Sequence, residues 1–431
     1  MRIGRPIAIA ALLTVIAIAV CVAWWLETGH DNKTNGSPLT QEAYVWQRAW
    51  TPGVRQAVQE HGPAFSGLVF LGAEISFTSG RPHVKHTDAD YALMAQQKRP
   101  VGLALRISAY SGRFAADGEP VDTIVSVAAG LVQQALRNGL NVRELQIDFD
   151  CPDSKLAGYA TWVAAIRKAI APTPIVITAL PSWLNQPDIE KLLNRTDGFI
   201  LQVHSLKRPS NAEHLPPLCN PKEASIAVER AGKFGRPFRV ALPTYSYRVA
   251  FTVEGRYLGI AAESPATPWP ADAVVRELRA EPSQMAMLVS QWARAHPANM
   301  QGIIWYRLPT SDDTMNWHWR TLQAVMAGQS PAAALSAEIQ VAKDGVADVV
   351  VVNTGSEDAD MDVVVKVDWA DGQLTAADAL AGFEKRPSQA AHQLEFAGKL
   401  RLRPAQQKTL GWIRLSENRE VHAHVETGIR Q

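Results

Sequence analysis

The sequence has 431 residues, of which 47% are hydrophobic and 20% are charged, and 43 Lys and Arg residues balance 42 Asp and Glu residues to a formal net charge of +1. This composition is typical of a globular protein that is long enough for one large domain and one small domain. Because the charges balance and no dense basic run occurs, the sequence argues against a nucleic-acid-binding protein.

An apolar run opens the chain. Residues Ile7 to Leu26 contain no charge, follow two arginines and end in Trp24 and Trp25. Since the run is long enough to cross a bilayer with its basic end inside, we expect residues 1–26 to be a signal anchor in the inner membrane. A cleaved signal peptide, which would make the protein secreted, is the alternative. Residues 27–42 are rich in Asn, Gly, Ser and Thr and are expected to form a flexible stalk.

Strand and helix patterns then alternate. We expect strands at 43–48, 68–75, 101–108, 144–152, 175–181, 198–204, 238–245 and 302–308, and helices at 52–59, 88–98, 121–138, 155–170, 187–193, 221–234, 283–295 and 319–326. Eight such pairs predict an α/β fold, a (β/α)8 TIM-like barrel over residues 43–327, with its active site at the C-terminal ends of the strands. A doubly wound open sheet is the alternative, but no Gly-rich phosphate loop follows the first strand.

The sequence changes character after residues 328–334, GQSPAAA, which we interpret as a linker. Alternating or β-branched runs such as ADVVVVN and MDVVVKVDW follow, and turn signals such as N-T-G and A-D-G separate them. These runs predict a small all-β sandwich at residues 335–416. We expect the polar tail at 417–431 to be loose.

The fourth strand of the predicted barrel, ELQIDFDCP at residues 144–152, carries two carboxylates on one face. Apolar Leu145, Ile147 and Phe149 alternate with polar Gln146, Asp148 and Asp150. Because burying an unpaired carboxylate is costly, two that point the same way indicate a solvated pocket, a metal, or paired acid and base chemistry. A pair of salt-bridged structural aspartates is the alternative.

Polar and aromatic residues also occur near the C-terminal ends of the other strands. They are Trp46, Glu74, Arg106, Ser108, Trp183, Gln202, His204, Thr244, Tyr245, Tyr247, Trp305 and Arg307. Aromatic side chains around carboxylates suit a sugar substrate, since aromatic faces stack on pyranose rings while acids act on the bond between them. Alternatively, Arg106 and Arg307 neutralise the aspartates in a structural network and His204 is a core residue. No H-x-E or H-E-x-x-H spacing occurs in the predicted barrel, so we expect no metal or cofactor.

Three segments carry a resemblance to a known family. The strand Gln146-Ile147-Asp148-Phe149-Asp150-Cys151-Pro152 resembles the D-x-D-x-E-Y-P signature of family 18 glycoside hydrolases, the chitinase-like barrels. Leu242-Pro243-Thr244-Tyr245 is similar to the G-x-P-x-Y segment of that family, and Gly302-Ile303-Ile304-Trp305 to its last strand, which has a Trp on the barrel floor. The whole chain also resembles an uncharacterised family of bacterial proteins known only as a domain of unknown function, number 3142.

The family 18 resemblance implies a retaining mechanism in which the N-acetyl group of the substrate attacks the anomeric carbon. It gives Asp150 the place of the general acid and Asp148 that of the aspartate that orients the N-acetyl group. Tyr245 or Tyr247 would hold the substrate, and a sugar would stack on Trp305. The sequence departs from the pattern twice: Gln146 replaces an aspartate, and Asp150 replaces a glutamate, which draws the carboxyl back by about 1 Å or more from the bond it must protonate.

Two functions remain open at this point. One is a glycoside-hydrolase-like protein of the bacterial envelope that acts on a polysaccharide or oligosaccharide on the periplasmic side and contacts the inner membrane through its N-terminal segment. The other is a catalytically degenerate barrel that binds glycan or organises an envelope assembly. We also expect Cys151 and Cys219 to form a disulfide across the barrel mouth, which requires their Cα atoms to lie within about 7 Å.

Overall fold

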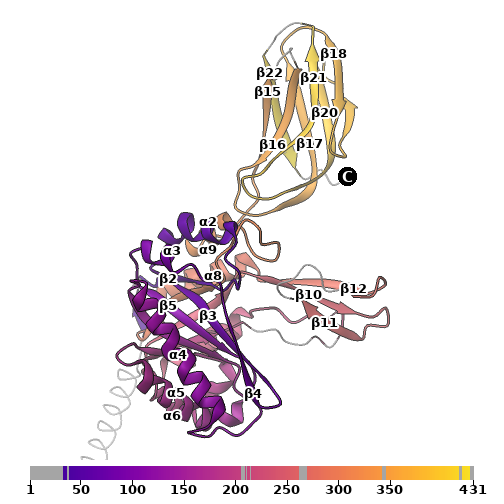
Figure 1. The fold of residues 1–431 in the computed structure, drawn as a ribbon. Helices are drawn as coiled ribbons and strands as arrows, with labels where there is room; N and C mark the ends of the chain where they lie inside the picture. The colour runs from indigo at the N-terminus through magenta and orange to yellow at the C-terminus, as the bar shows by residue number, and fades with distance from the viewer. Residues whose placement is uncertain are drawn as a thin grey trace, which may run out of the picture.

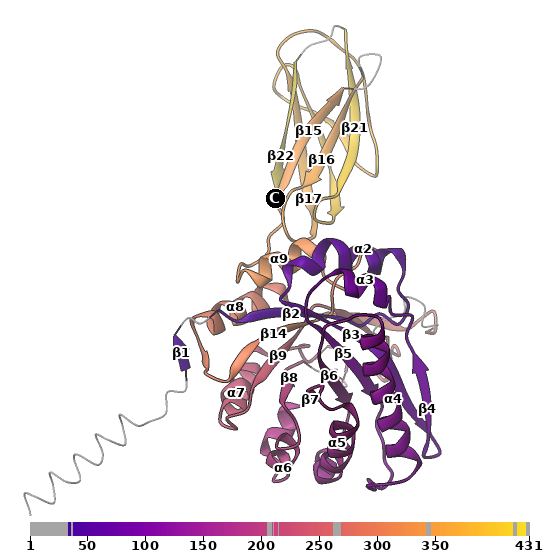
Figure 2. The same ribbon diagram turned by 60° about the vertical axis from the view of Figure 1, so that its left-hand side comes forward.

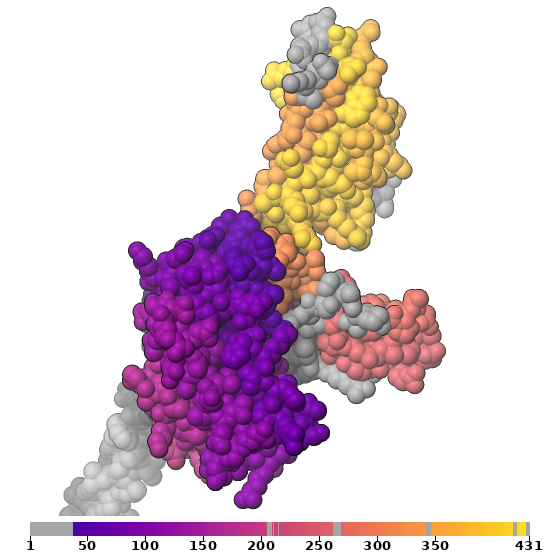
Figure 3. Space-filling model, viewed as in Figure 1, coloured from indigo at the N-terminus to yellow at the C-terminus, as the bar shows by residue number. Residues whose placement is uncertain are grey.

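A computed structural model describes residues 33–35, 38–204, 209, 211–213, 215–261, 269–341, 346–416 and 420–427. The expected signal anchor at residues 1–26 lies outside the described residues. Among the residues that are described, no helix is long and apolar enough to span a bilayer. The chain forms a barrel, a projecting three-stranded sheet and a β-sandwich beyond the barrel (Figures 1 and 3).

Eight parallel strands form the barrel, as predicted. In order around it they are β2 (Thr40–Val45), β3 (Gly67–Thr78), β5 (Val101–Ile107), β6 (Val142–Phe149), β7 (Ile175–Ala179), β8 (Gly198–Gln202), β9 (Phe238–Pro243) and β14 (Met300–Tyr306). The sheet is closed because β2 pairs with both β14 and β3. This closure excludes the doubly wound alternative, which is an open sheet.

Helices cover the outside of the barrel (Figure 2). They are α2 (Pro52–His61), α3 (Tyr91–Gln96), α4 (Glu119–Arg137), α5 (Leu156–Ile170), α6 (Ile189–Leu193), α7 (Pro221–Gly232), α8 (Pro282–Arg294) and α9 (Trp319–Met326). Local signals in the sequence fix several ends. The Thr51 hydroxyl accepts a hydrogen bond from the Val54 N–H at 3.3 Å and caps α2. Gly139, at φ 75°, follows α4, where its left-handed backbone ends the helix.

Side chains alternate across the barrel wall. Outward residues such as Phe70, Leu103 and Ile147 pack against the helices. Inward residues form a separate apolar cluster inside the barrel that includes Val69, Leu71, Ala104, Val176, Ile200 and Ile304. The interior is therefore packed, and only the mouth at the C-terminal strand ends is left for a ligand.

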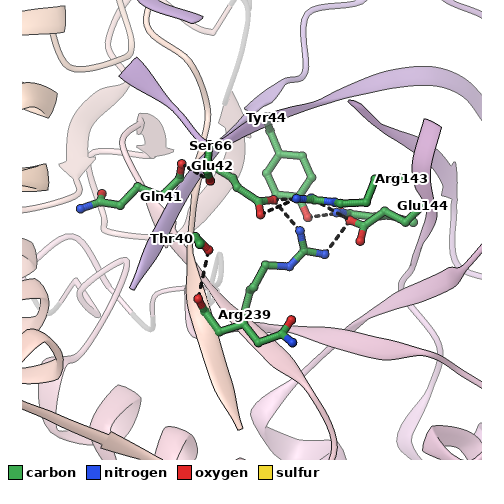
Figure 4. Close-up of polar contacts among 10 residues, drawn as sticks. Thr40, Gln41, Glu42, Tyr44, Ser66, Arg143, Glu144 and Arg239 are labelled. Atoms are coloured by element: carbon green, nitrogen blue, oxygen red, sulfur yellow. Dashed lines mark hydrogen bonds and ion pairs between the residues drawn. The ribbon is translucent and has the colours of Figure 1, made fainter. Parts of the chain in front are cut away.

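Ion pairs close the opposite, N-terminal end of the barrel (Figure 4). The buried Arg239 guanidinium donates to both Glu42 and Glu144. Arg143 donates two further hydrogen bonds to Glu42, at 2.8 and 2.7 Å. Because each buried carboxylate has a cationic partner, these charges can remain away from water. We call Glu42, Arg143, Glu144 and Arg239 the floor network.

Several strands were not predicted. β4 (Arg81–His86) returns antiparallel along β3, and β1 (Lys33–Asn35) pairs with β13 (Ala295–Pro297). β10 (Ser246–Phe251), β11 (Tyr257–Ala261) and β12 (Val274–Arg279) form the projecting sheet between β9 and α8. These segments are short, and β4, RPHVKH, has too few apolar residues to show a period of two. The expected stalk at 27–42 is thus wrong in part, since it contains β1 and Thr40 begins β2.

The predicted β-sandwich is confirmed. One sheet has the order β15 (Leu335–Val341), β16 (Val346–Asn353), β21 (Gln407–Leu415) and β18 (Leu374–Ala379), and the other β19 (Glu384–Pro387), β20 (Gln393–Leu402), β17 (Ala359–Trp369) and β22 (Val421–Thr427). Residues 328–334, the expected linker, contain neither helix nor strand.

The expectation of a loose tail is wrong for residues 421–427, which form β22. This strand pairs antiparallel with β17 and places Val421, Ala423 and Val425 against the sandwich core. The alternation of these residues with His422 and His424 has the period of a half-buried strand, a signal that the polar composition of the tail obscured.

Candidate functional site

A pocket of about 470 Å³ opens at the C-terminal ends of the barrel strands. Its lining residues are Tyr44, Trp46, Arg48, Arg106, Asp148, Asp150, Thr178, Leu180, Gln202, His204, Ala241, Tyr245, Tyr306 and Arg307. This is the end of the barrel at which the sequence predicted a site. Of the residues that the sequence placed near the C-terminal strand ends, Trp46, Arg106, Asp148, Asp150, Gln202, His204, Tyr245 and Arg307 line this pocket.

One guanidinium joins the two aspartates of β6. Arg106 lies on β5 directly opposite Asp148 in the strand pairing. Its Nη1 donates to Asp148 Oδ2 at 3.0 Å, and its Nη2 donates to Asp150 Oδ2 at 3.2 Å. The planar, fork-shaped guanidinium thereby fixes both carboxylates relative to each other. The sequence-based alternative of a neutralising network is correct for Arg106, whereas Arg307 pairs with Asp313 instead.

The two carboxylates lie in different environments. The Asp148 side chain is 12% exposed, whereas that of Asp150 is 55% exposed. Burial raises the pKa of Asp148 above its ordinary value, and the charge of Asp150 raises it further. The charge of Arg106 and the hydrogen bond from the Thr178 hydroxyl at 2.9 Å lower the pKa and offset part of this rise. The pocket thus combines a buried carboxyl that retains its proton to higher pH with a carboxylate in contact with solvent.

Glu74 lies next to this pair without lining the pocket. Arg48 donates to Glu74 through Nε at 2.6 Å and Nη2 at 2.8 Å, and Arg106 Nε lies 4.0 Å from the same carboxylate. Glu74 therefore holds two arginines at the pocket edge. The sequence predicted Glu74 as a substrate-binding residue, and in the structure its contacts are with these arginines.

Four aromatic residues form a wall in the pocket: Tyr44 from β2, Trp46 directly after it, Tyr306 from β14, and Tyr245 after β9. The ring centroids lie 5.1 Å apart for Tyr44 and Trp46, 5.3 Å for Trp46 and Tyr306, and 5.5 Å for Tyr245 and Tyr306. Because β6 is fourth and β14 eighth in the closed order, this aromatic wall lies across the barrel from the aspartates. The pocket offers an aromatic surface on one side and acids on the other.

His204 is a neutral group in the pocket wall. It is 4% exposed, and burial lowers its pKa to about 3. Its Nδ1 lies 3.4 Å from the Tyr245 hydroxyl oxygen, while its Nε2 is buried and has no hydrogen-bond partner among the described residues. Since a buried imidazole nitrogen without a partner is costly, Nε2 is suited to a hydrogen bond with a ligand.

The prediction for Trp305 is wrong, because the alternation on β14 runs one residue out of step with it. Ile304 and Tyr306 point into the barrel. Trp305 points outward and is fully buried; its indole N–H donates to Gln41 Oε1 at 2.8 Å, and its ring lies 6.2 Å from that of Trp317. Tyr306 takes the place in the pocket that the family 18 resemblance gave to Trp305.

Three further predicted residues lie outside the pocket. Trp183, in the 3-10 helix Pro181–Asn185, is fully buried with its ring 6.1 Å from that of Tyr159. Tyr247 is buried in β10, and burial raises its pKa to about 12. Gln146 lies inside the barrel beneath Asp148, where it accepts a hydrogen bond from the Tyr44 hydroxyl at 2.6 Å. The first two are packing residues, and the third supports the pocket from below.

The predicted disulfide is wrong. Cys151 and Cys219 are free thiols, and burial raises the pKa of each to about 12. Cys151 follows β6, whereas Cys219 directly precedes α7, after β8. The intervening β7 separates the two strands, so each thiol is buried in its own part of the molecule.

The sequence missed several pocket residues: Tyr44, Arg48, Thr178, Leu180, Ala241 and Tyr306. A period of two was available as a signal for some of them. Tyr44 precedes Trp46 by two positions, Arg48 follows Trp46 by two positions within the expected strand 43–48, and Thr178 lies two positions before Leu180.

Two families of unknown function match the chain. One, described as Domain of unknown function (DUF3142), matches residues 97–311. This match lies within the barrel and the projecting sheet. The DUF3142 match includes Arg106, Asp148, Asp150, His204 and Tyr306, so most of the pocket lies within it. Another, described as Domain of unknown function (DUF8456), matches residues 337–416, in the sandwich.

Solved structures with similarity to the chain include chitinases and spore cortex-lytic enzymes. A chitinase from Chromobacterium violaceum ATCC 12472 is 13% identical, with 68% of this chain and 98% of that chain covered and a TM-score of 0.47. The spore cortex-lytic enzyme SleL from Bacillus megaterium QM B1551 is 12% identical, with 64% and 71% covered and a TM-score of 0.45. A family GH18 chitinase from Chromobacterium violaceum is 12% identical, with 90% and 91% covered and a TM-score of 0.43. No curated protein matches the sequence.

Proposed function

We propose that this protein is a glycoside-hydrolase-like enzyme that acts on a polysaccharide at the barrel mouth, with Asp150 as general acid and Asp148 as its buried partner. The observation that carries the proposal is the arrangement of the pocket: one exposed and one buried carboxyl, joined by Arg106, face an aromatic wall across the barrel. Sugars stack on aromatic faces, and paired carboxyls with different environments divide acid and partner roles between them.

The two carboxyls would have separate tasks. Asp150 contacts solvent and would deliver a proton to the oxygen of the leaving sugar. Asp148, fixed by Arg106 and Thr178, would orient the N-acetyl group of the substrate, whose oxygen would attack the anomeric carbon as the bond to the leaving sugar breaks. Water would then open the resulting ring at the same carbon, so that the two displacements together retain the configuration, as the family 18 resemblance implies. His204 Nε2 would hydrogen-bond a sugar hydroxyl in the same pocket.

A second candidate is a barrel that binds glycan without cleaving it. One contact favours this candidate: the hydrogen bond from Arg106 to Asp150, at 3.2 Å, stabilises a carboxylate, whereas a general acid must carry a proton. For proton transfer, the substrate would have to displace Arg106 from Asp150. The Arg48 and Glu74 contacts at the pocket edge give Arg106 an alternative partner when it does so.

We also propose that the barrel lies outside the inner membrane of a bacterial envelope, held there by the apolar run at residues 7–26. The barrel begins with β2 at the end opposite the pocket, so the mouth would face away from the membrane. In spheroplasts, externally added protease should digest the sandwich while cytoplasmic proteins stay intact. Protection of the sandwich until the membrane is lysed would contradict this placement.

The proposed activity is tested with Asp150→Asn. We expect wild-type protein to release reducing ends from peptidoglycan, chitin-like or exopolysaccharide substrates, and the variant to lose at least about 100-fold in rate because the proton donor is gone. Glu338→Gln, which removes one exposed carboxylate in the sandwich, is the matched control and should keep full activity.

Calorimetric titration with oligosaccharides separates the two candidates. Saturable binding with no turnover by wild-type protein supports the binding function. Equal turnover by wild type and Asp150→Asn removes Asp150 from the mechanism, and the absence of both binding and turnover overturns the two candidates together.

A further inference from the structure

The β3–β4 hairpin extends beyond the rim of the barrel mouth. β3 has 12 residues, and its pairing with the neighbouring barrel strand β5 ends where Ile75 lies opposite Ile107. Ser76, Phe77 and Thr78 continue past this point and pair with β4 alone. At about 3.3 Å per residue, the strand carries its side chains roughly 13 Å outward from Glu74 to Thr78. The hairpin is visible as a long arm in Figures 1 and 2.

One face of this hairpin is basic. Opposite residues of an antiparallel pair share a face, and Glu74, Ser76 and Thr78 lie opposite Lys85, His83 and Arg81. Arg81, His83 and Lys85 are exposed and make no ion pair within the described residues. Residues 76–86 contain no acid that would neutralise them. We call Arg81, His83 and Lys85 the basic strip.

The basic strip is continuous with the pocket. Glu74, on the same face, contacts Arg48 and Arg106, which line the pocket next to Asp148 and Asp150. The opposite face of the hairpin holds it to the protein, since Phe77 packs with its ring centroid 4.6 Å from that of Tyr110. The hairpin therefore presents the strip to solvent from an anchored position.

We propose that the basic strip binds an acidic polysaccharide whose chain continues out of the pocket; the proposal rests on the proposed function, because the pocket must hold a sugar. The strip has no Trp, Tyr or Phe, so it recognises charge and hydroxyl groups instead of ring faces. Alternate residues of one strand lie about 6.6 Å apart on a face, which gives the strip a regular spacing suited to anionic groups that recur along a chain.

Charge complementarity favours an acidic glycan over other polyanions. The chain has a formal net charge of only +1 and no dense basic run, so its sequence lacks the broad basic surface of a nucleic-acid binder. The strip also lies at the barrel end opposite the start of β2, away from the side at which the N-terminal segment enters. A glycan bound in the pocket can extend directly onto the strip.

The test is a calorimetric titration of the full-length protein with three ligands of matched length: a carboxylated oligosaccharide (oligogalacturonate), a phosphate-bearing polymer (glycerol-phosphate teichoic acid) and a neutral chitin oligosaccharide. We expect at least one acidic ligand to bind more tightly than the neutral one, and its binding to weaken as salt rises. The double variant Arg81→Gln/Lys85→Gln should weaken that binding about tenfold and leave neutral binding unchanged. The two acidic ligands show whether carboxylates or phosphates are preferred.

The matched control is Arg137→Gln/Lys168→Gln. It removes two exposed cations from the last turns of α4 and α5, which lie toward the N-terminal end of the barrel, and should bind every ligand as the wild type does. Equal melting temperatures of the two double variants would show that folding does not explain a difference in binding.

Three outcomes would overturn the proposal. Equal affinity of both double variants for acidic ligands would show that the strip does not contact them. Preference for the neutral oligosaccharide, with turnover lost in Asp150→Asn, would overturn the strip alone and leave the proposed function standing. Tighter binding to vesicles of phosphatidylglycerol and phosphatidylcholine, or to a DNA duplex, that depends on Arg81 and Lys85 would assign the strip to a membrane or a nucleic acid.

Discussion

At the scale of single residues, Gln146 explains one departure from the family 18 pattern. Its Oε1 accepts a hydrogen bond from the Tyr44 hydroxyl at 2.6 Å, and its Nε2 donates a hydrogen bond to Glu144 Oε1 at 2.6 Å. It thereby joins an aromatic residue of the pocket to the floor network. An aspartate can accept from Tyr44 but has no hydrogen to donate to Glu144, so the position needs an amide as long as Glu144 stands beneath it.

Gln146→Glu tests this explanation. The change removes the donor and places a second buried carboxylate against Glu144, so we expect the free energy of unfolding to fall by about 1–3 kcal/mol or more. Gln146→Leu, which leaves Glu144 its contacts with Arg143 and Arg239, should lose less. Urea denaturation measures both, and a Gln146→Glu protein as stable as the wild type would refute the donor role.

His204 gives a pH-dependent prediction. Its pKa of about 3 in the folded protein lies below the ordinary value of 6.5, so below pH 6.5 the unfolded chain takes up a proton that the folded protein does not. Stability is therefore present above pH 6.5 and is lost as the pH falls toward 3, by up to about 1.4 kcal/mol per pH unit. His204→Gln should flatten the decline of the melting temperature between pH 6.5 and 4. Superimposable profiles of variant and wild type would contradict this.

At the scale of elements, β14 shows why a strand pattern can be recognised while its register is not. Its sequence, MQGIIWY, places apolar or aromatic residues at consecutive positions, because one face packs inside the barrel and the other packs under helices. Because no polar residues occur at alternate positions, a period of two cannot show which face of such a strand points outward. The register came from pairing with β9 and β2, which turns Tyr306 inward and Trp305 outward.

The two neighbours should respond differently to truncation. Trp305→Ala leaves a cavity in the layer between barrel and helices and should cost about 3–5 kcal/mol of stability, with little change in glycan affinity for the protein that remains folded. Tyr306→Ala removes part of the aromatic wall and should weaken glycan binding more than Trp305→Ala does. Denaturation measures the stability of both variants, and calorimetric titration measures their glycan affinity. If Trp305→Ala weakened glycan binding more than Tyr306→Ala does, Trp305 would belong to the binding site after all.

At the scale of the whole molecule, one end of the barrel holds buried ion pairs and the other end holds the candidate site. The floor network buries Glu42, Glu144 and Arg239 at the N-terminal end, and the pocket occupies the C-terminal end. The sandwich contacts the projecting sheet through an ion pair of another kind, Arg279 with Glu357 at 3.0 Å, whose side chains are 40% and 33% exposed. Buried charges that lose a partner are costly, whereas exposed pairs contribute little.

Arg239→Met and Arg279→Gln form a contrasting pair of variants. Arg239→Met leaves Glu42 and Glu144 with Arg143 as their shared cation, and we expect it to cost about 3–5 kcal/mol. Arg279→Gln should cost less than about 1 kcal/mol because its partner is exposed. Thermal and urea unfolding provide the comparison, and a smaller loss in Arg239→Met than in Arg279→Gln would show that the floor network does not stabilise the barrel.

The sequence by itself determined the features that depend on local periodicity. Eight alternations of strand and helix predicted the barrel, β-branched runs predicted the sandwich, and the period of two along Gln146, Asp148 and Asp150 placed the acid pair at one end of strand four. Each of these signals lies within about 10 to 20 residues of chain, where side-chain direction follows from backbone geometry alone.

Only the tertiary structure decided which residues meet. Arg106 joins Asp148 and Asp150 because β5 pairs with β6 in one register, and Tyr44 faces Tyr306 because the barrel closes between β2 and β14. Cys151 and Cys219 stay apart because β7 lies between the strands before them. Such contacts depend on the pairing of strands that are distant in the sequence. A one-residue shift in that pairing would turn every side chain of a strand to its other face, and the local sequence does not specify which pairing forms.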